Sequence, residues 1–233
     1  MTANSLGSQK SIFINGEGDA WFKRNQQLLN STNDRPTTRK LIETLRPLAE
    51  TIETILEIGC GNGVELEKIC CSLGARGIGV EPSPEAVRLG NERIAKGNVS
   101  ATIHVGAADA LPCTDESVDL LYFGFCLYLV DRKDIMMAIA EAHRVLKPGG
   151  FLAILDFDPV HTHRRAYVHH DGIYSYKQYY SRILLATEMY TNVARYGLSH
   201  HQEYFDLDSD ERISLTVLHK EIQPYSEWQM ANW

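Results

Sequence analysis

The stretch that decides the fold is ILEIGCGNG, residues 55–63, in which a short apolar run ends in three alternate glycines. Glycine permits positive φ and, without a Cβ, lets a ligand approach the main chain closely. The pattern predicts a buried strand, a turn whose backbone N–H groups face a ligand, and then a helix. It is not the G-x-G-x-x-G of dinucleotide sites, because Val64 stands where the third glycine would be, and it lacks the Gly-Lys-Ser/Thr of phosphate loops.

Around this stretch, short apolar runs alternate with amphipathic segments, which is typical of a parallel sheet covered by helices. The Lys147-Pro148-Gly149-Gly150 run predicts the end of the last of these helices. The expected strands are 54–58, 77–80, 101–105, 118–123 and 151–157, the expected helices are 19–29, 37–50, 64–73, 84–95 and 131–146, and two last strands are expected within 183–196 and 211–221.

Three carboxylates follow or end successive strands. Glu57 lies inside the end of the first strand, where it would repel a diphosphate and attract an amino ligand. Glu81 ends the second strand and could accept two hydrogen bonds from a ribose diol, although an acid at a helix N-terminus is the alternative. Asp109 follows the third strand and could accept from an adenine amine, or be a solvated turn residue. Three acids at one sheet edge are more specific than any one of them.

Composition excludes several function classes. The chain has 23 Lys plus Arg against 30 Asp plus Glu, a net charge of −7, and no long basic run, so nucleic acid and membrane surfaces are poor candidates for partners. The five cysteines form no paired pattern and are expected to be reduced thiols. We find no signal peptide or membrane-spanning run and expect a cytoplasmic protein whose oligomeric state is unknown.

The segments ILEIGCGNG, VEPSPEAV, GAADALPCTDESVDLLYF and RVLKPGGFLAILDF resemble, in order, the signatures of the class I S-adenosylmethionine-dependent methyltransferases, in particular their small-molecule branch. The resemblance covers about residues 50–158. It implies a cofactor site for S-adenosylmethionine built from Glu57, Gly59, Cys60, Gly61, Gly63, Glu81, Pro82, Asp109, Ala110, Phe123 and Gly124. Pro82, where Ser or Asp is commoner, removes a backbone donor near the ribose.

The resemblance predicts an α/β, Rossmann-like, seven-stranded, mostly parallel sheet with helices on both faces, an N-terminal helical lid and an insertion after the fifth strand. We expect residues 1–36 to hold a mobile lead-in and the lid helix, and residues 37–233 to form the methyltransferase domain, with the insertion at about 159–182 as a loop or helix. The short segment GEGDAWFKRN also resembles a stretch of relatives found with sugar or surface-polysaccharide genes, which suggests a sugar or nucleotide-sugar acceptor.

The acceptor pocket is expected between the lid helix and the insertion. Methyl transfer chiefly needs alignment, and a hydroxyl acceptor also gains from a general base such as histidine. The candidate catalytic residues are His163, His170 and Tyr128, and the candidate substrate-binding residues are Trp21, Asn25, His161, His169, Tyr174 and Tyr176. For each alone, a surface or packing role is the alternative. The paired histidines could suggest a metal site, but we expect no metal, because no cysteine joins them and the spacing is not compact.

The sequence therefore predicts a methyltransferase acting on the oxygen or nitrogen of a small molecule. The alternatives are a catalytically inactive cofactor-binding partner or regulatory subunit, another transferase such as an aminopropyl transferase, and, more remotely, a dehydrogenase.

Overall fold

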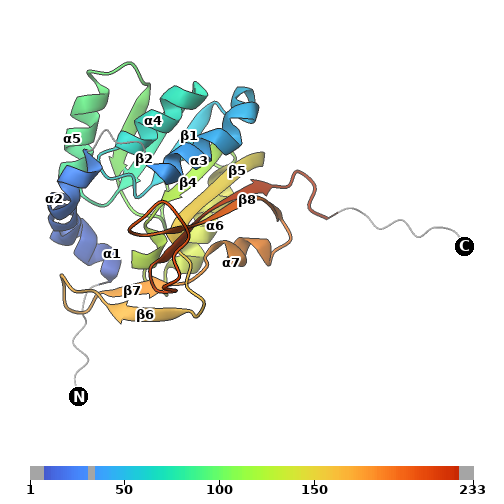
Figure 1. The fold of residues 1–233 in the computed structure, drawn as a ribbon. Helices are drawn as coiled ribbons and strands as arrows, with labels where there is room; N and C mark the ends of the chain where they lie inside the picture. The colour runs from blue at the N-terminus through green and yellow to red at the C-terminus, as the bar shows by residue number, and fades with distance from the viewer. Residues whose placement is uncertain (1–7, 31–34, 226–233) are drawn as a thin grey trace, which may run out of the picture.

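The computed structural model of the protein describes residues 8–30 and 35–225 (Figure 1). Its centre is a seven-stranded sheet with the order β3-β2-β1-β4-β5-β9-β8. β9 is antiparallel to both its neighbours, and the other pairings are parallel. The strands are β1 Thr54–Ile58, β2 Arg76–Glu81, β3 Ala101–Val105, β4 Val118–Gly124, β5 Leu146–Phe157, β8 Tyr190–Ser199 and β9 Arg212–Lys220. The predicted sheet is confirmed.

Helices cover both faces of the sheet. α3 and α4 pack on one face, where Leu45 and Ile69 are fully buried. α6 and α7 pack on the other face, with Ala138 and Leu184 in the core. α5 lies against β3 on the α4 face. The bounds are α3 Pro36–Leu45, α4 Val64–Leu73, α5 Pro84–Ile94, α6 Ile135–Val145 and α7 Ser181–Leu185.

The helix expected to run to residue 50 changes character at Pro47. α3 ends at Leu45, and a 3₁₀ helix spans Arg46–Thr51. Proline has no N–H to give to the preceding turn, so an α-helix cannot continue through this position without losing a hydrogen bond.

The N-terminal region is more ordered than we expected. α1 Gln9–Ile12 and a π-helical turn, Phe13–Glu17, precede α2 Gly18–Leu29. The turn is kinked at Gly16, whose φ of 150° suits glycine. The mobile lead-in was expected to reach about residue 15, but among its described residues Gln9 and Phe13 are buried. The rest of that prediction, residues 1–7, lies outside the described residues.

The insertion after β5 contains two short strands that we did not expect within its loop. It forms an antiparallel hairpin of β6 His163–Ala166 and β7 Tyr174–Lys177, which stands apart from the main sheet beside α1 (Figure 1). The alternation of Arg, Tyr and His was too short and too polar to reveal these strands. The next expected strand, within 183–196, begins at Tyr190 because α7 occupies its first residues.

None of the described helices has the length and hydropathy needed to cross a membrane.

The arrangement of the sheet determines where a ligand site can form. β1, β2, β3 and β4 run parallel, so their carboxyl ends meet at one edge, where Glu57, Glu81, Gly106 and Gly124 gather. In open α/β sheets this edge is where ligands bind.

Candidate functional site

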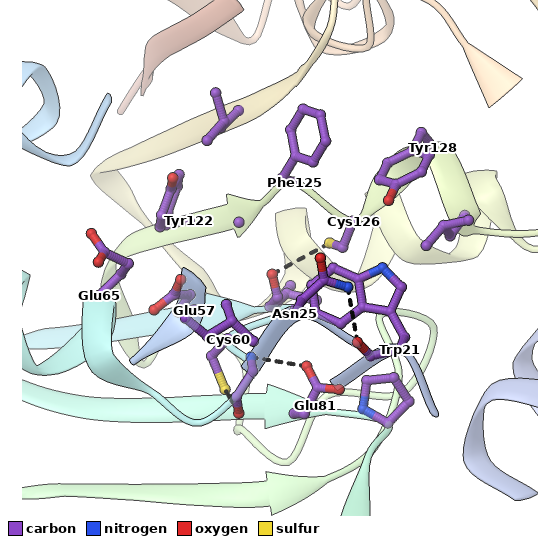
Figure 2. A pocket seen from close by; sticks show the side chains of 18 of the residues that line it. Trp21, Asn25, Glu57, Cys60, Glu65, Glu81, Tyr122, Phe125, Cys126 and Tyr128 are labelled. Atoms are coloured by element: carbon purple, nitrogen blue, oxygen red, sulfur yellow. Dashed lines mark hydrogen bonds between the residues drawn. The ribbon is translucent and has the colours of Figure 1, made fainter. Parts of the chain in front are cut away.

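A cavity of about 660 Å³ opens at the carboxyl edge of the sheet (Figure 2). Its floor is the turn after β1, and its walls come from α2, the ends of β2 and β3, the segment after β4, the β6–β7 hairpin and residues 198–203. Pockets of this size enclose most of a small ligand. The lining is mainly apolar, with carboxylates at one side.

The glycine turn forms part of the cavity wall, but its three glycines do different work. Gly59, Gly61 and Gly63 all have positive φ, at 75°, 54° and 75°. A Cβ on Gly61 would make ordinary contact with Leu29 at 3.6 Å, so the surroundings leave room for a side chain there. A Cβ on Gly63 would lie 2.6 Å from Ile103, and this residue does not line the cavity. Gly63 therefore serves the packing of α4, and Gly61 the approach of a ligand.

Glu57 presents a buried carboxylate to the cavity. Its side chain is 3% exposed, and its Oε2 atom has no hydrogen-bond partner among the described residues. Burial, with the nearby Glu65 carboxylate, raises its pKa to about 8. Gly124 leaves room for this group, because a Cβ there would lie 2.8 Å from Glu57 Oε1. An unsatisfied buried carboxylate is costly, so the site suits a ligand that brings a positive charge and N–H donors.

Arg35, at the start of α3, lies beside this carboxylate. Its Nε atom is 3.5 Å from Glu65 Oε1, and Arg35 and Glu65 both line the cavity. The positive charge of Arg35 opposes the rise in the Glu57 pKa. Sequence reasoning missed Arg35, because it lies outside any motif and reaches the site only through the placement of α3. Together the three side chains offer both charges that an amino acid moiety needs.

Glu81 ends β2 and lines the same cavity. Its carboxylate accepts from the backbone N–H groups of Gly61 at 2.9 Å and Ser83 at 3.0 Å. Burial raises its pKa to about 7, and the two backbone donors act against this rise. The carboxylate thus fixes the glycine turn relative to β2 while its remaining lone pairs stay available to a diol.

Asp109 lies in the turn after β3, on the far side of Glu81 from the glycine loop, and it is held by the N-terminal segment. Lys10 Nζ lies 2.5 Å from Asp109 Oδ2, and the Asp109 side chain is 15% exposed. Both residues line the cavity. The ion pair brings α1 over the turn where an adenine edge was expected.

α1 and α2 are tied down by side chains that sequence analysis did not identify. The Gln9 side-chain amide donates to the carbonyls of Leu129 and Tyr174, and its oxygen accepts from Tyr174 N at 2.7 Å. Asp19 accepts from Ser83 Oγ and from Glu85 N at the start of α5. These contacts hold the N-terminal helices across the cavity mouth. A glutamine in a polar lead-in carried no signal for this role.

A third connection joins α2 to the β6–β7 hairpin. Arg24 donates to Glu17 Oε1 at 2.5 Å and to the Tyr167 hydroxyl at 3.0 Å, and that hydroxyl donates to Glu17 at 3.0 Å. Tyr167 lines the cavity. The hairpin and α2 therefore close one side of the cavity together.

The half of the cavity beyond Gly124 is aromatic. Trp21 and Tyr128 lie on the same side of it (Figure 2), and the indole of Trp21 is a hydrogen-bond partner of the Tyr128 side chain. Phe125 has a φ of 61°, unusual for a bulky residue, and stacks on His200 at 5.3 Å with an interplanar angle of 11°. Backbone strain of this kind often accompanies ligand sites. Burial raises the Tyr128 pKa, so its phenol stays protonated and can only donate or accept a hydrogen bond.

The structure brings together most of the residues singled out from the sequence. Those that line the cavity are Trp21, Asn25, Glu57, Gly59, Cys60, Gly61, Glu81, Pro82, Asp109, Gly124, Tyr128 and His169. Those placed outside its lining are Gly63, Ala110, Phe123, His161, His163, His170, Tyr174 and Tyr176. Three residues of the second group make contacts elsewhere in the fold. Phe123 is fully buried in the core, His163 Nε2 lies 3.6 Å from Asp210, and Arg132 lies over the Tyr176 ring.

The cavity fits an S-adenosyl compound at each of its parts. The unpartnered Glu57 oxygen and Arg35 match an ammonium and a carboxylate, Gly61 lines the cavity without a side chain, and Glu81 and Asp109 offer acceptors at the ends of the two neighbouring strands.

Comparison with known proteins agrees with this geometry. Residues 55–150 match the family described as "Methyltransferase domain". A ubiquinone/menaquinone biosynthesis C-methyltransferase of Methylococcus capsulatus is 34% identical over 131 residues, which are 54% of this chain and 50% of that protein. This chain thus matches about half the length of that relative.

Two solved structures share the fold. The 1,6-didemethyltoxoflavin-N1-methyltransferase of Burkholderia thailandensis, crystallised with its substrate and S-adenosylhomocysteine, has a TM-score of 0.67 at 13% identity, over 95% of this chain and 93% of that one. The [4+2]-cyclase SpnF has a TM-score of 0.57 at 16% identity, over 78% and 82%. The family match over residues 55–150, the sheet order and the cavity together support a class I S-adenosylmethionine-dependent methyltransferase domain in this part of the chain.

Proposed function

We propose that this protein transfers a methyl group from S-adenosylmethionine to a small molecule bound in the aromatic half of the cavity. The observation that carries the proposal is the buried Glu57 carboxylate, which lacks a partner at Oε2 and faces a cavity that also holds Glu81 and Asp109. The three acids meet at one sheet edge, as an adenosyl amino acid requires.

The chain's own residues would hold the cofactor as follows. Glu57 and Arg35 receive the amino acid moiety, Glu81 the ribose hydroxyls and Asp109 the adenine edge, while Gly61, which lines the cavity without a side chain, allows close approach. When bound, S-adenosylmethionine supplies a methyl group activated by a sulfonium. The leaving group is a neutral thioether, so its departure needs little assistance. The protein mainly has to align the acceptor and keep water out.

The acceptor half is formed by side chains that favour a molecule with an apolar or aromatic surface. Trp21, Phe125 and Tyr128 supply rings, and Leu155, Leu198 and Ile213 supply an aliphatic wall. Tyr128 offers its hydroxyl as a hydrogen-bond donor to an acceptor oxygen or nitrogen. A sugar or nucleotide sugar stays a candidate, because polar side chains such as Asn25, Ser199 and Gln202 also line the cavity.

A direct test is methyl transfer from cofactor carrying a labelled methyl group to a panel of phenols, heteroaromatic amines, quinols and nucleotide sugars. We expect transfer to an aromatic acceptor, and loss of transfer in the Asp109→Ala variant with its fold retained. Cofactor binding in the wild type without transfer to any panel member would count against the acceptor classes named here.

A second candidate is binding without methyl transfer, either as an inactive partner subunit or with other chemistry. The observation that favours it is that the fold is shared with a [4+2]-cyclase, so the fold does not by itself fix the reaction. Turnover separates the two candidates: the second predicts tight S-adenosylmethionine binding with no S-adenosylhomocysteine formed in the presence of any acceptor.

A further inference from the structure

Two histidines that line the cavity, His200 and His201, meet Glu211, which is not one of its lining residues. His201 Nε2 lies 3.2 Å from Glu211 Oε2, and His200 Nδ1 lies 3.7 Å from the same oxygen. One ligand atom from each residue lies within 4.8 Å of the other two. Three nitrogen and oxygen atoms grouped in this way can share one metal ion.

We propose that His200, His201 and Glu211 bind a divalent transition-metal ion, with Zn²⁺ as the preferred ion. Two imidazoles and a carboxylate are the protein ligands of many zinc sites that keep a fourth position open. Metal–ligand distances of about 2.0–2.2 Å in a tetrahedron place neighbouring ligand atoms about 3.3 Å apart. The two distances to Glu211 Oε2 are near this value, and the two imidazole nitrogens, which lie within 4.8 Å of one another, reach it by side-chain rotation.

The backbone fixes these residues before any ion binds. His200 and Glu211 lie opposite one another where β8 and β9 separate, and His200 N donates to Glu211 O at 2.8 Å. His201 N donates to Ser199 Oγ at 3.0 Å. The Phe125 ring stacks on the His200 imidazole and restricts its rotation. Metal-ligating side chains that are already held by backbone hydrogen bonds and ring stacking lose little conformational entropy when they bind a metal.

The Glu211 carboxylate is oriented from its other side. Its Oε1 atom lies 3.6 Å from Arg165 and 3.9 Å from Lys177, which directs Oε2 to the two imidazoles. Lys177 is itself buried and held against Phe157. The two cations also repel a metal ion, so we expect affinity in the micromolar range rather than that of a structural zinc site.

The three-residue cluster lies close to the half of the cavity where we place the acceptor. His200 stacks on Phe125, which directly follows the cavity-lining Gly124 at the end of β4. An ion held by these residues would lie beside the aromatic half of the cavity, because both histidines line the cavity and His200 stacks on Phe125. The ligand class it would take there is an oxygen donor such as a hydroxyl, an enolate or a carboxylate. Metal binding itself does not depend on the proposed methyl transfer.

The test is calorimetric titration of Zn²⁺ into chelator-treated full-length protein, in a background where the exposed Cys71 is replaced by Ser so that its thiol does not bind metal. We expect one ion per chain, with affinity at least about tenfold weaker in His201→Ala and Glu211→Gln. His219→Ala is the matched control, because His219 also lies beside a glutamate, at 3.3 Å from Glu221, but is not part of the three-residue cluster. Its affinity should equal that of the parent.

A second measurement guards against variants that fail to fold. Co²⁺ bound by the parent should give a visible absorption band that is lost in His201→Ala, while melting temperature and S-adenosylhomocysteine affinity show whether that variant is folded. Absence of zinc binding to the parent would overturn the proposal, as would equal binding to the parent and both cluster variants. Neither result would bear on the methyltransferase proposal, which cofactor titration tests separately.

Discussion

Lys10 Nζ lies 2.5 Å from Asp109 Oδ2, and this ion pair joins the first helix to the turn after β3, 99 residues later in the chain. Asp109 is thus shared between the N-terminal helices and the expected adenine position. Asp109 would hold α1 through Lys10 and would accept from the adenine amine. Mutation can separate these two roles, because only the first involves Lys10.

We expect Lys10→Ala to change S-adenosylhomocysteine affinity less than about fivefold, since an ion pair with a 40% exposed lysine contributes about 0–1 kcal/mol. Asp109→Ala removes the lysine's partner and the adenine acceptor together, and should weaken binding at least about tenfold. Calorimetric titration of both variants gives the comparison. Equal losses in the two would show that Asp109 acts only by holding α1.

The raised pKa of Glu57 predicts a pH dependence of stability. Between the ordinary value of 4.5 and about 8, the folded state binds a proton at Glu57 that the unfolded state releases. Raising the pH through this window therefore lowers the free energy of unfolding, by up to about 1.4 kcal/mol per pH unit. We expect the wild type to lose stability relative to Glu57→Gln between about pH 6 and pH 8.

Chemical denaturation of both proteins at each pH measures this difference. Glu81 and Asp156, whose pKa values are also raised by burial, to about 7, contribute with the same sign, but both proteins contain them. A constant difference between wild type and variant across the window would contradict the burial argument. The same ionisation should make the wild type bind S-adenosylhomocysteine more tightly as pH rises, because the ligand ammonium favours the charged carboxylate.

Two glycines of the turn should respond differently to alanine. At Gly63, with φ +75°, a Cβ would lie 2.6 Å from Ile103, so Gly63→Ala should lower the melting temperature. At Gly61, with φ +54°, a Cβ would make only ordinary contact with Leu29 at 3.6 Å, so the cost is mainly about 1–2 kcal/mol of left-handed strain. We expect Gly61→Ala to lose proportionally more cofactor affinity. Thermal melts and cofactor titrations of both variants test this. A larger loss of melting temperature in Gly61→Ala, together with a larger loss of affinity in Gly63→Ala, would refute the assignment.

Tyr128 is expected to orient the acceptor through its hydroxyl. Tyr128→Phe keeps the ring that contacts Phe125 and removes only the oxygen. We expect the variant to bind S-adenosylhomocysteine as the wild type does, and to lose about tenfold in kcat/KM for the acceptor. Because burial keeps the phenol protonated, the pH profile of the remaining activity should match that of the wild type. A shifted profile would indicate that Tyr128 takes part in proton transfer.

The strands that build the cofactor half could be predicted because their signals are local. β1 and β3 begin and end where their apolar runs do, and the glycine turn follows β1 as expected. The acids at the strand ends gather because parallel strands share an edge, a consequence of topology rather than of any one motif.

The acceptor half could not be predicted in the same way. The contacts of Gln9 with Leu129 and Tyr174 span 120 and 165 residues, and no sequence pattern near Gln9 predicts them. The histidines chosen from the insertion, His163 and His170, lie in or beside a hairpin whose strands have only four residues each, too short for periodicity to show which side each residue faces. His200 reaches the cavity only because β8 and β9 separate there.

The central claim is that Glu57, Glu81 and Asp109 enclose one S-adenosyl ligand, and calorimetric titration of S-adenosylhomocysteine tests it most directly. We predict one ligand per chain, no binding of NADH, and affinity lowered at least about tenfold in each of Glu57→Gln, Glu81→Ala and Asp109→Ala, with the folded state retained. Undiminished affinity in all three variants, or no binding to the wild type, would contradict the account.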